Sequence, residues 1–281
     1  MFPFDRLDRL EDLSALDKVA QPLSRAVDAA VRPQAVEDAL HGTWLGHPLH
    51  TALVQLPIGS FLSATLLDLF GRDERSADLL AGIGLASSLP AAAAGATDWS
   101  KSNPSTQRVG LVHALLNTAG LALWTGSLVA RRAGRRRAGT GWGLVGTAVL
   151  GASAALGGHL SYRDGLGANH EADIADTGPT DWTDIGGADV PEGKPVLRDA
   201  AGTPVLLVRT GESIEALANR CSHQAGPLHE GTLHDGCVTC PWHGSTFRMS
   251  TGAVVHGPSV HPQPALDVRR REGRLEVRLR A

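Results

Sequence analysis

Four long apolar runs fill the amino-terminal part of the chain, whereas the carboxy-terminal part alternates short apolar stretches with polar residues. The runs contain no Lys or Arg, and each is long enough to cross a hydrocarbon layer of about 30 Å as a helix. A soluble bundle would show polar residues at a 3.6-residue period, and these are nearly absent. We predict membrane-spanning helices at about 52–70, 77–97, 109–130 and 141–160.

The segment before these runs is amphipathic. Its leucines lie along one side of a charged helix: Leu7, Leu10, Leu13, Leu16 and Leu23. Such a helix either lies in the membrane interface or covers the protein's own helices. Residues 5–18 mix acidic and basic side chains, so we expect no cleavable signal peptide.

The pattern predicts a multidomain protein, an all-α four-helix transmembrane bundle followed by an all-β domain. Val205 to Val208 and Leu275 to Leu279 contain residues typical of strands. The expected segments are an amphipathic helical segment (1–41), a membrane domain (42–165), a polar linker (166–180) and the β domain (181–281).

The β domain carries four candidate metal ligands in two short groups. Cys221-Ser222-His223 is followed by sixteen residues and then by Cys240-Pro241-Trp242-His243. Two thiolates and two imidazoles at such spacing are the donors of a Rieske-type [2Fe-2S] centre. A structural Zn²⁺ is the alternative, although zinc ligands at such spacings usually sit on knuckles or a helix rather than among strand residues.

The sequences CSHQAGPLHEG, CPWHGSTF and GAVVHGPSVHPQP resemble the Rieske family over about residues 180–281. The resemblance implies that Cys221 and Cys240 hold a buried iron and that His223 and His243 hold an outer one. It also implies that the loop with Pro258 covers the cluster.

The flanking residues resemble the ferredoxin type of this family. The resemblance implies a tuning hydroxyl at Ser245, but Phe247 stands where quinol-oxidising members have Tyr. Gly226 and Trp242 stand where those members have a disulfide, so a lower reduction potential is expected. Cys237 is expected to be a small buried strand residue.

The amino-terminal half resembles the uncharacterised DUF2231 family of bacterial membrane domains. The similar stretches are GHPLHTALVQLPIG (46–59), GATDW (95–99), RVGLVHALLN (108–117) and GGHLSYRDG (157–165). No activity comes with this resemblance.

Four crossings place several ionisable residues at one level of the membrane domain: His47, His50, Asp98, His113 and His159. Such residues are costly in a bundle and often functional. A haem b iron and a quinone are candidate ligands, with His113 and His159 as the best pair. The alternative is that each residue only caps a helix end or lies at the interface.

Arginines gather in the loops of one face: Arg72, Arg75, Arg131, Arg132, Arg135, Arg136 and Arg137. The opposite loop has Lys101 and Arg108, so the positive-inside rule places the β domain on the outer side of a bacterial inner membrane. The cytoplasmic side is the alternative. The pair Arg131-Arg132 either resembles an internal twin-arginine export signal or only orients the loop.

The sequence therefore predicts a membrane-anchored iron–sulfur protein that carries single electrons between redox partners. The alternatives are an integral quinol or haem-linked oxidoreductase and a redox sensor or assembly module without substrate. A Rieske oxygenase needs a further iron site of two His and one carboxylate, and 38 residues after His243 are too few for that domain. We expect membrane lipid and a redox protein or quinone as partners, and no nucleic acid.

Overall fold

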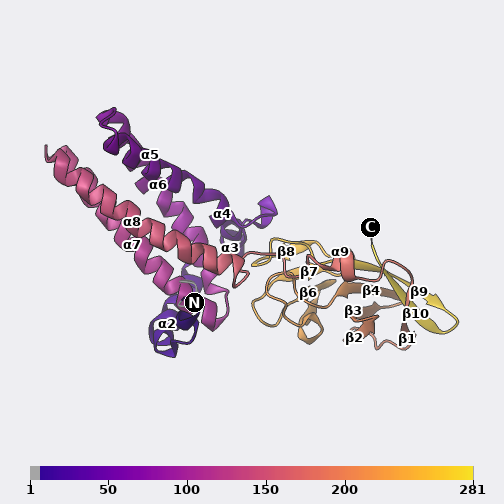
Figure 1. The fold of residues 1–281 in the computed structure, drawn as a ribbon. Helices are drawn as coiled ribbons and strands as arrows, with labels where there is room; N and C mark the ends of the chain where they lie inside the picture. The colour runs from indigo at the N-terminus through magenta and orange to yellow at the C-terminus, as the bar shows by residue number, and fades with distance from the viewer. Residues whose placement is uncertain (1–6, 281) are drawn as a thin grey trace. The chain divides into compact units, whose positions relative to one another are not determined.

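The computed structural model describes residues 7–280, and the chain forms two units. The helical unit consists of residues 7–32 and 48–166, and the β unit of residues 33–47 and 167–280 (Figure 1). The predicted fold class, a helical region followed by a β domain, is confirmed. A short helical segment that precedes the first apolar run groups with the β unit.

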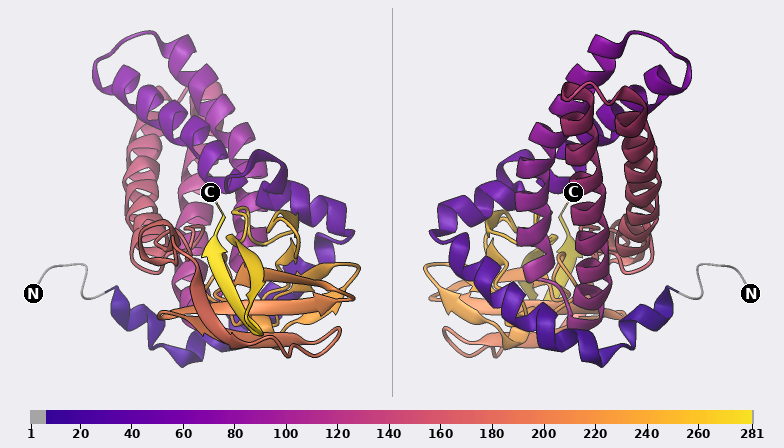
Figure 2. Two further views of the ribbon diagram at one scale, coloured as in Figure 1. Left: turned by 90° about the vertical axis from the view of Figure 1, so that its right-hand side faces the viewer. Right: turned by 90° about the vertical axis from the view of Figure 1, so that its left-hand side faces the viewer.

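Within residues 7–280, four helices are long and apolar enough to cross a membrane. They run side by side in the helical unit (Figures 1 and 2). The first consists of α4 (Leu49–Leu53) and α5 (Gln55–Leu69), and the others are α6 (Glu74–Ser100), α7 (Pro104–Arg132) and α8 (Arg136–Tyr162). The first begins before its predicted apolar run, and the other three extend past both ends of theirs into polar flanks.

Local signals set the helix ends and the close packing of α7 and α8. The Asp73 carboxylate accepts hydrogen bonds from two N–H groups in the first turn of α6, and Pro104 begins α7. A Cβ on Gly120 would lie 2.6 Å from Leu150, so the absence of a side chain lets the two helices approach.

The amino-terminal helices cover the bundle rather than standing apart from it. They are α1 (Asp8–Glu11), the 3-10 turn η2 (Ser14–Leu16) and α2 (Asp17–Ala30). Ala20 of α2 is fully buried against Trp99 and Leu111. The Arg108 guanidinium lies 2.7 Å from the Asp17 carboxylate. The amphipathic segment therefore packs on the protein's own helices.

The β unit contains two antiparallel sheets. The six-stranded sheet has the order β1-β10-β9-β4-β3-β2, and the four-stranded sheet the order β5-β6-β7-β8. The strands are β1 (Thr183–Gly187), β2 (Pro195–Ala200), β3 (Thr203–Thr210), β4 (Ser213–Ala218), β5 (Thr232–His234), β6 (Cys237–Thr239), β7 (Thr246–Arg248), β8 (Val254–His256), β9 (Ala265–Arg271) and β10 (Arg274–Leu279). Short helices are α3 (Gln34–His41), η3 (Thr43–Leu45), α9 (Ile174–Thr177) and η4 (Leu228–Glu230).

Two-residue turns with positive φ at both positions join several strand pairs. Ala201-Gly202, Asp235-Gly236 and Glu272-Gly273 all have this conformation. It matches the right-handed twist of the strands and so fixes their register. Cys237 begins the strand after one of these turns and is buried, as predicted.

Candidate metal centre

Two loops of the β unit carry the predicted ligands Cys221, His223, Cys240 and His243. The first loop follows β4, and the second joins β6 to β7. The Cys221 N–H donates to the Gly226 carbonyl and the Cys240 N–H to the Ser245 carbonyl, each over 2.8 Å. These bonds close each loop and hold its ligands near the end of a strand.

The loops bring like donors together in pairs. Cys221 is 1% exposed and Cys240 is 4% exposed, and their side chains are hydrogen-bonded to each other. The rings of His223 and His243 lie edge to face, with centroids 5.1 Å apart and an interplanar angle of 81°. Two sulfur atoms and two imidazoles are thus available to a bound group.

Backbone N–H groups favour negative charge on both sulfur atoms. The hydrogen bond with Cys221 lowers the pKa of the Cys240 thiol to about 7, and the backbone N–H groups of Trp242 and His243 act in the same direction. The shared hydrogen bond and burial raise the pKa of Cys221, while the backbone N–H of His223 opposes this. Backbone N–H groups directed at sulfur suit thiolate ligands.

The two histidines differ in accessibility. His223 is 7% exposed, and burial holds its pKa well below the ordinary value, so its imidazole is neutral. His243 is half-buried, and the neighbouring Trp242 is 53% exposed. The Trp242 and His243 rings lie edge to face at 6.3 Å. His243 and Trp242 therefore form the accessible side of the site.

The predicted tuning residues lie inside the unit. The Ser245 hydroxyl accepts a hydrogen bond from the Ser259 N–H over 3.0 Å, which leaves its own proton free to donate. Phe247 is fully buried and packs in the same core as Cys221 and Cys240.

Helix α3 holds the loop that contains Pro258, a contact that sequence reasoning missed. The Asp38 carboxylate accepts from the Gly257 N–H over 2.8 Å and lies 2.9 Å from His256 Nδ1. His41 is fully buried, and a Cβ on Gly257 would lie 2.8 Å from its ring. No local pattern links α3 to a loop so distant in sequence.

A second missed contact joins the predicted linker to the first ligand loop. The His170 N–H donates to the Ser222 carbonyl over 3.0 Å. Arg220 Nε lies 2.9 Å from the carboxylate of Glu171, which is 4% exposed. Burial raises the pKa of Glu171 to about 7, although the charge of Arg220 opposes this.

The histidines of the helical unit bond to neighbouring helices. His50 Nδ1 lies 2.8 Å from the Ala91 carbonyl, and His113 Nδ1 lies 2.8 Å from the Ser153 carbonyl. These contacts join α4 to α6 and α7 to α8. Of the other candidates, Asp98 lies in α6, and His47 belongs to the segment that groups with the β unit.

The proposed haem pair is not supported. His113 faces Ser153 and Gly157 of α8, and His159 is two residues beyond Gly157. At about 100° per residue, the His159 side chain leaves α8 in a different direction. It meets carboxylates of α1 instead. These contacts support neither a haem nor a quinone at the two histidines.

The donors in the β unit fit a [2Fe-2S] group. Such a group needs a pair of thiols, a pair of imidazoles and N–H groups directed at the sulfur atoms. The same four side chains would also suit zinc.

Two protein families match this chain. The Rieske [2Fe-2S] domain family matches residues 182–269. A family described as predicted membrane proteins, DUF2231, matches residues 46–170. Both resemblances drawn from the motifs are confirmed, and the first implies a [2Fe-2S] cluster.

Individual relatives match parts of the chain. The anthranilate 1,2-dioxygenase ferredoxin subunit of Burkholderia cepacia is 34% identical over 98 residues, which are 34% of this chain and 91% of that protein. Apoptosis-inducing factor 3 of Mus musculus is 35% identical over 26% of this chain, but the match covers 12% of that protein. The solved ferredoxin of carbazole 1,9a-dioxygenase from Nocardioides aromaticivorans IC177 is 31% identical, with a TM-score of 0.34, over 35% of this chain and 98% of that one.

Proposed function

We propose, because the chain belongs to the Rieske [2Fe-2S] family, that it is a membrane-anchored carrier of single electrons. The observation that carries the proposal is the convergence of two buried thiols and two imidazoles from the loops after β4 and β6. A bound cluster supplies one-electron transfer, and the protein supplies its ligands and surroundings.

Cys221 and Cys240 would hold the inner iron, and His223 and His243 the outer iron. Backbone N–H groups near both sulfur atoms favour their thiolate form. The Ser245 hydroxyl and the buried Phe247 ring would then shape the reduction potential, since polarity and hydrogen bonding around ligand sulfur set it.

The redox partner would dock at Trp242 and His243. These side chains form the accessible side of the site, whereas His223 is buried. An exposed Trp is typical of a contact surface because it offers a large apolar ring with one polar N–H. Similarity to a dioxygenase ferredoxin subunit supports a redox protein as the partner.

The helical unit would be the membrane anchor. Its outer surface carries large apolar side chains, among them Leu56, Leu66, Leu79, Leu89, Leu115 and Val145, all at least half exposed. Its buried positions are often small or polar, such as Ala64, Ser88 and Ser153. This distribution is the reverse of a soluble bundle and suits helices that face lipid.

The test is metal analysis and EPR of the full chain purified in detergent from washed membranes. We expect two irons and two labile sulfides per chain, and a Rieske-type EPR signal after reduction. His243→Ala should abolish the signal, whereas His234→Ala, at a side chain that is 82% exposed in β5, should leave it unchanged. Stoichiometric zinc without the EPR signal would overturn the cluster, and recovery of the chain in the soluble fraction would overturn the anchor.

A further inference from the structure

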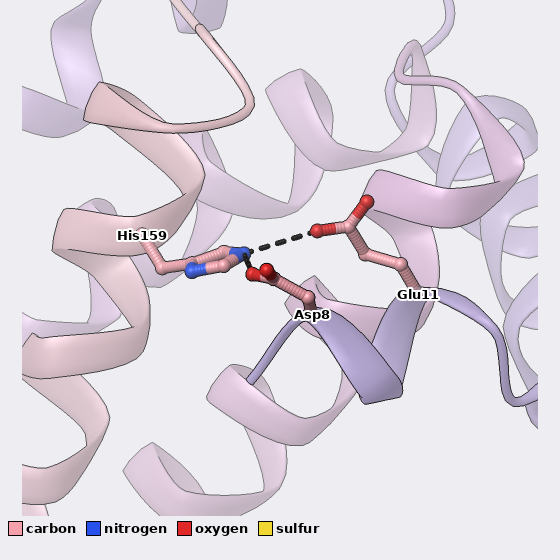
Figure 3. Close-up of side chains that lie close together, drawn as sticks. All are labelled: Asp8, Glu11 and His159. Carbon is pink, nitrogen blue, oxygen red and sulfur yellow. Dashed lines mark hydrogen bonds and ion pairs between the residues drawn. The ribbon is translucent and has the colours of Figure 1, made fainter. Parts of the chain in front are cut away.

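A second group of metal-binding side chains lies in the helical unit, where α1 meets the end of α8. His159 of α8 faces Asp8 and Glu11 of α1 (Figure 3), and their ligand atoms lie within 4.8 Å of one another. His159 Nε2 is 3.1 Å from the Glu11 carboxylate and 3.9 Å from that of Asp8. The imidazole itself is 2% exposed.

Asp164 adds a buried carboxylate to this group. Its Oδ1 lies 3.4 Å from the same His159 Nε2, and its side chain is 7% exposed. Among the described residues, Asp164 Oδ2 is buried without a hydrogen-bond partner. A buried carboxylate oxygen without a partner is costly, so it calls for a proton or a cation at this place.

The charges of the group favour a cation. Arg163 forms an ion pair with Asp8, and Arg108 donates to the Glu11 backbone carbonyl while its ion pair is with Asp17. Three carboxylates and one arginine leave two negative charges around the buried imidazole. One divalent ion would balance them.

We propose that Asp8, Glu11 and His159 bind one divalent first-row transition ion, and that the neighbouring Asp164 carboxylate adds to the negative charge that attracts it. Carboxylates suit Mn²⁺ and imidazole suits Fe²⁺ or Zn²⁺, so the mixed set selects this class over Ca²⁺ or Mg²⁺. The ion would connect the amino-terminal helix to the end of the fourth long helix. This site is separate from the cysteine and histidine donors of the β unit and does not depend on the function proposed for them.

Equilibrium dialysis of the full chain against Mn²⁺ tests the site, with manganese measured by atomic absorption so that cluster iron does not interfere. We expect one saturable Mn²⁺ per chain and a higher melting temperature in its presence, because a ligand of the folded state stabilises it. His159→Gln and Glu11→Gln should each weaken binding by about tenfold or more, because losing even a group that only supports a metal ligand costs about 10–100-fold in affinity.

Asp12→Asn is the matched control, since Asp12 is exposed and next to Glu11; its binding should equal that of the unchanged chain. Asp164→Asn, which removes one charge with little change of shape, serves if His159→Gln does not fold. Absence of saturable binding, or equal binding in all variants, would overturn the proposal.

Discussion

At Gly226 the first ligand loop packs closely against the second. A Cβ there would lie 2.8 Å from Cys240 Sγ and 3.2 Å from the Trp242 ring. A disulfide between the loops would need sulfur atoms at positions 226 and 242. The Trp242 ring packs against Gly226 there instead. The loops are therefore held together by packing and by backbone hydrogen bonds rather than by a disulfide.

Phe247 supplies the first prediction, which concerns the reduction potential. Phe247→Tyr should raise the midpoint potential, because a phenolic hydroxyl in this core can donate to ligand sulfur and stabilise the reduced form. A hydrogen bond of about 1 kcal/mol corresponds to about 40 mV for one electron. Redox titration followed by EPR measures the change, with Phe247→Leu as a control that adds no donor. An unchanged or lowered potential in Phe247→Tyr would show that the hydroxyl does not reach sulfur.

Glu171 supplies a prediction about pH. Its pKa is about 7 in the folded chain, mainly because of burial, against an ordinary value of 4.5. Between these values the folded state holds more protons than the unfolded state, so the contribution of Glu171 to stability is greatest below pH 4.5 and falls as pH rises to 7. The change is about 3 kcal/mol. Hydrogen exchange of β3 and β4 amides, corrected for the intrinsic effect of pH, should show this fall.

Glu171→Gln should remove the fall between pH 4.5 and 7, because the amide does not titrate. Asp176→Asn, at an exposed carboxylate in the same short segment, is the matched control and should keep it. A Glu171→Gln chain with the original pH profile would place the titrating group elsewhere.

The cytoplasm-facing ends predicted for the long helices are joined by buried ion pairs. The Arg131 side chain of α7 is fully buried and pairs with Asp68 of α5, which is 3% exposed. It also lies 3.1 Å from Asp78 of α6. Arg131 therefore has a structural role. Replacing it with Lys to test whether Arg131-Arg132 is an export signal would also disturb the packing of the helices.

Asp68→Asn should destabilise the helical unit by about 3 kcal/mol, because it leaves a buried guanidinium with less compensating charge. Thermal unfolding in detergent, followed by loss of the monodisperse species in size-exclusion chromatography, measures this. Glu74→Gln removes a carboxylate that is 72% exposed and 3.9 Å from Arg136, so it should have little effect. Equal melting of Asp68→Asn and the unchanged chain would mean that the network contributes no stability.

Elements with a local cause could be predicted from the sequence, and those with a distant cause could not. The four long helices follow from uninterrupted apolar runs, and the ligand loops follow from a Cys and His spacing that few kinds of metal site share. Asp38 and His41, by contrast, lie in a short helix whose partner loop at Gly257 is far along the chain. The sequence also has no local signal that Asp8 and Glu11 lie beside His159, because this contact depends on how α1 packs against α8.

The course of the whole chain favours an even number of membrane crossings. The chain passes between the units three times, because residues 33–47 group with residues 167–280. Helix α3 precedes the first long helix, and the β strands follow the fourth. Helix α3 and the β strands can therefore contact each other only if both lie on the same side of the membrane. Four crossings satisfy this condition, and three or five would not.

The last prediction concerns which side that is. The arginines of the loops after α5 and α7 predict a cytoplasmic location for those loops and an outer location for α3 and the β unit. We expect a membrane-impermeant maleimide to label Glu212→Cys and Gln34→Cys in intact spheroplasts and Arg72→Cys only after lysis; all three positions are exposed. The unchanged chain is the control, since its cysteines are all buried. Labelling of Arg72→Cys alone in intact spheroplasts would reverse the orientation and place the electron carrier in the cytoplasm. If only one of Glu212→Cys and Gln34→Cys were labelled in intact spheroplasts, the two positions would lie on opposite sides of the membrane. This would contradict the even number of crossings, because Asp38 of α3 forms hydrogen bonds with the loop at His256 and Gly257.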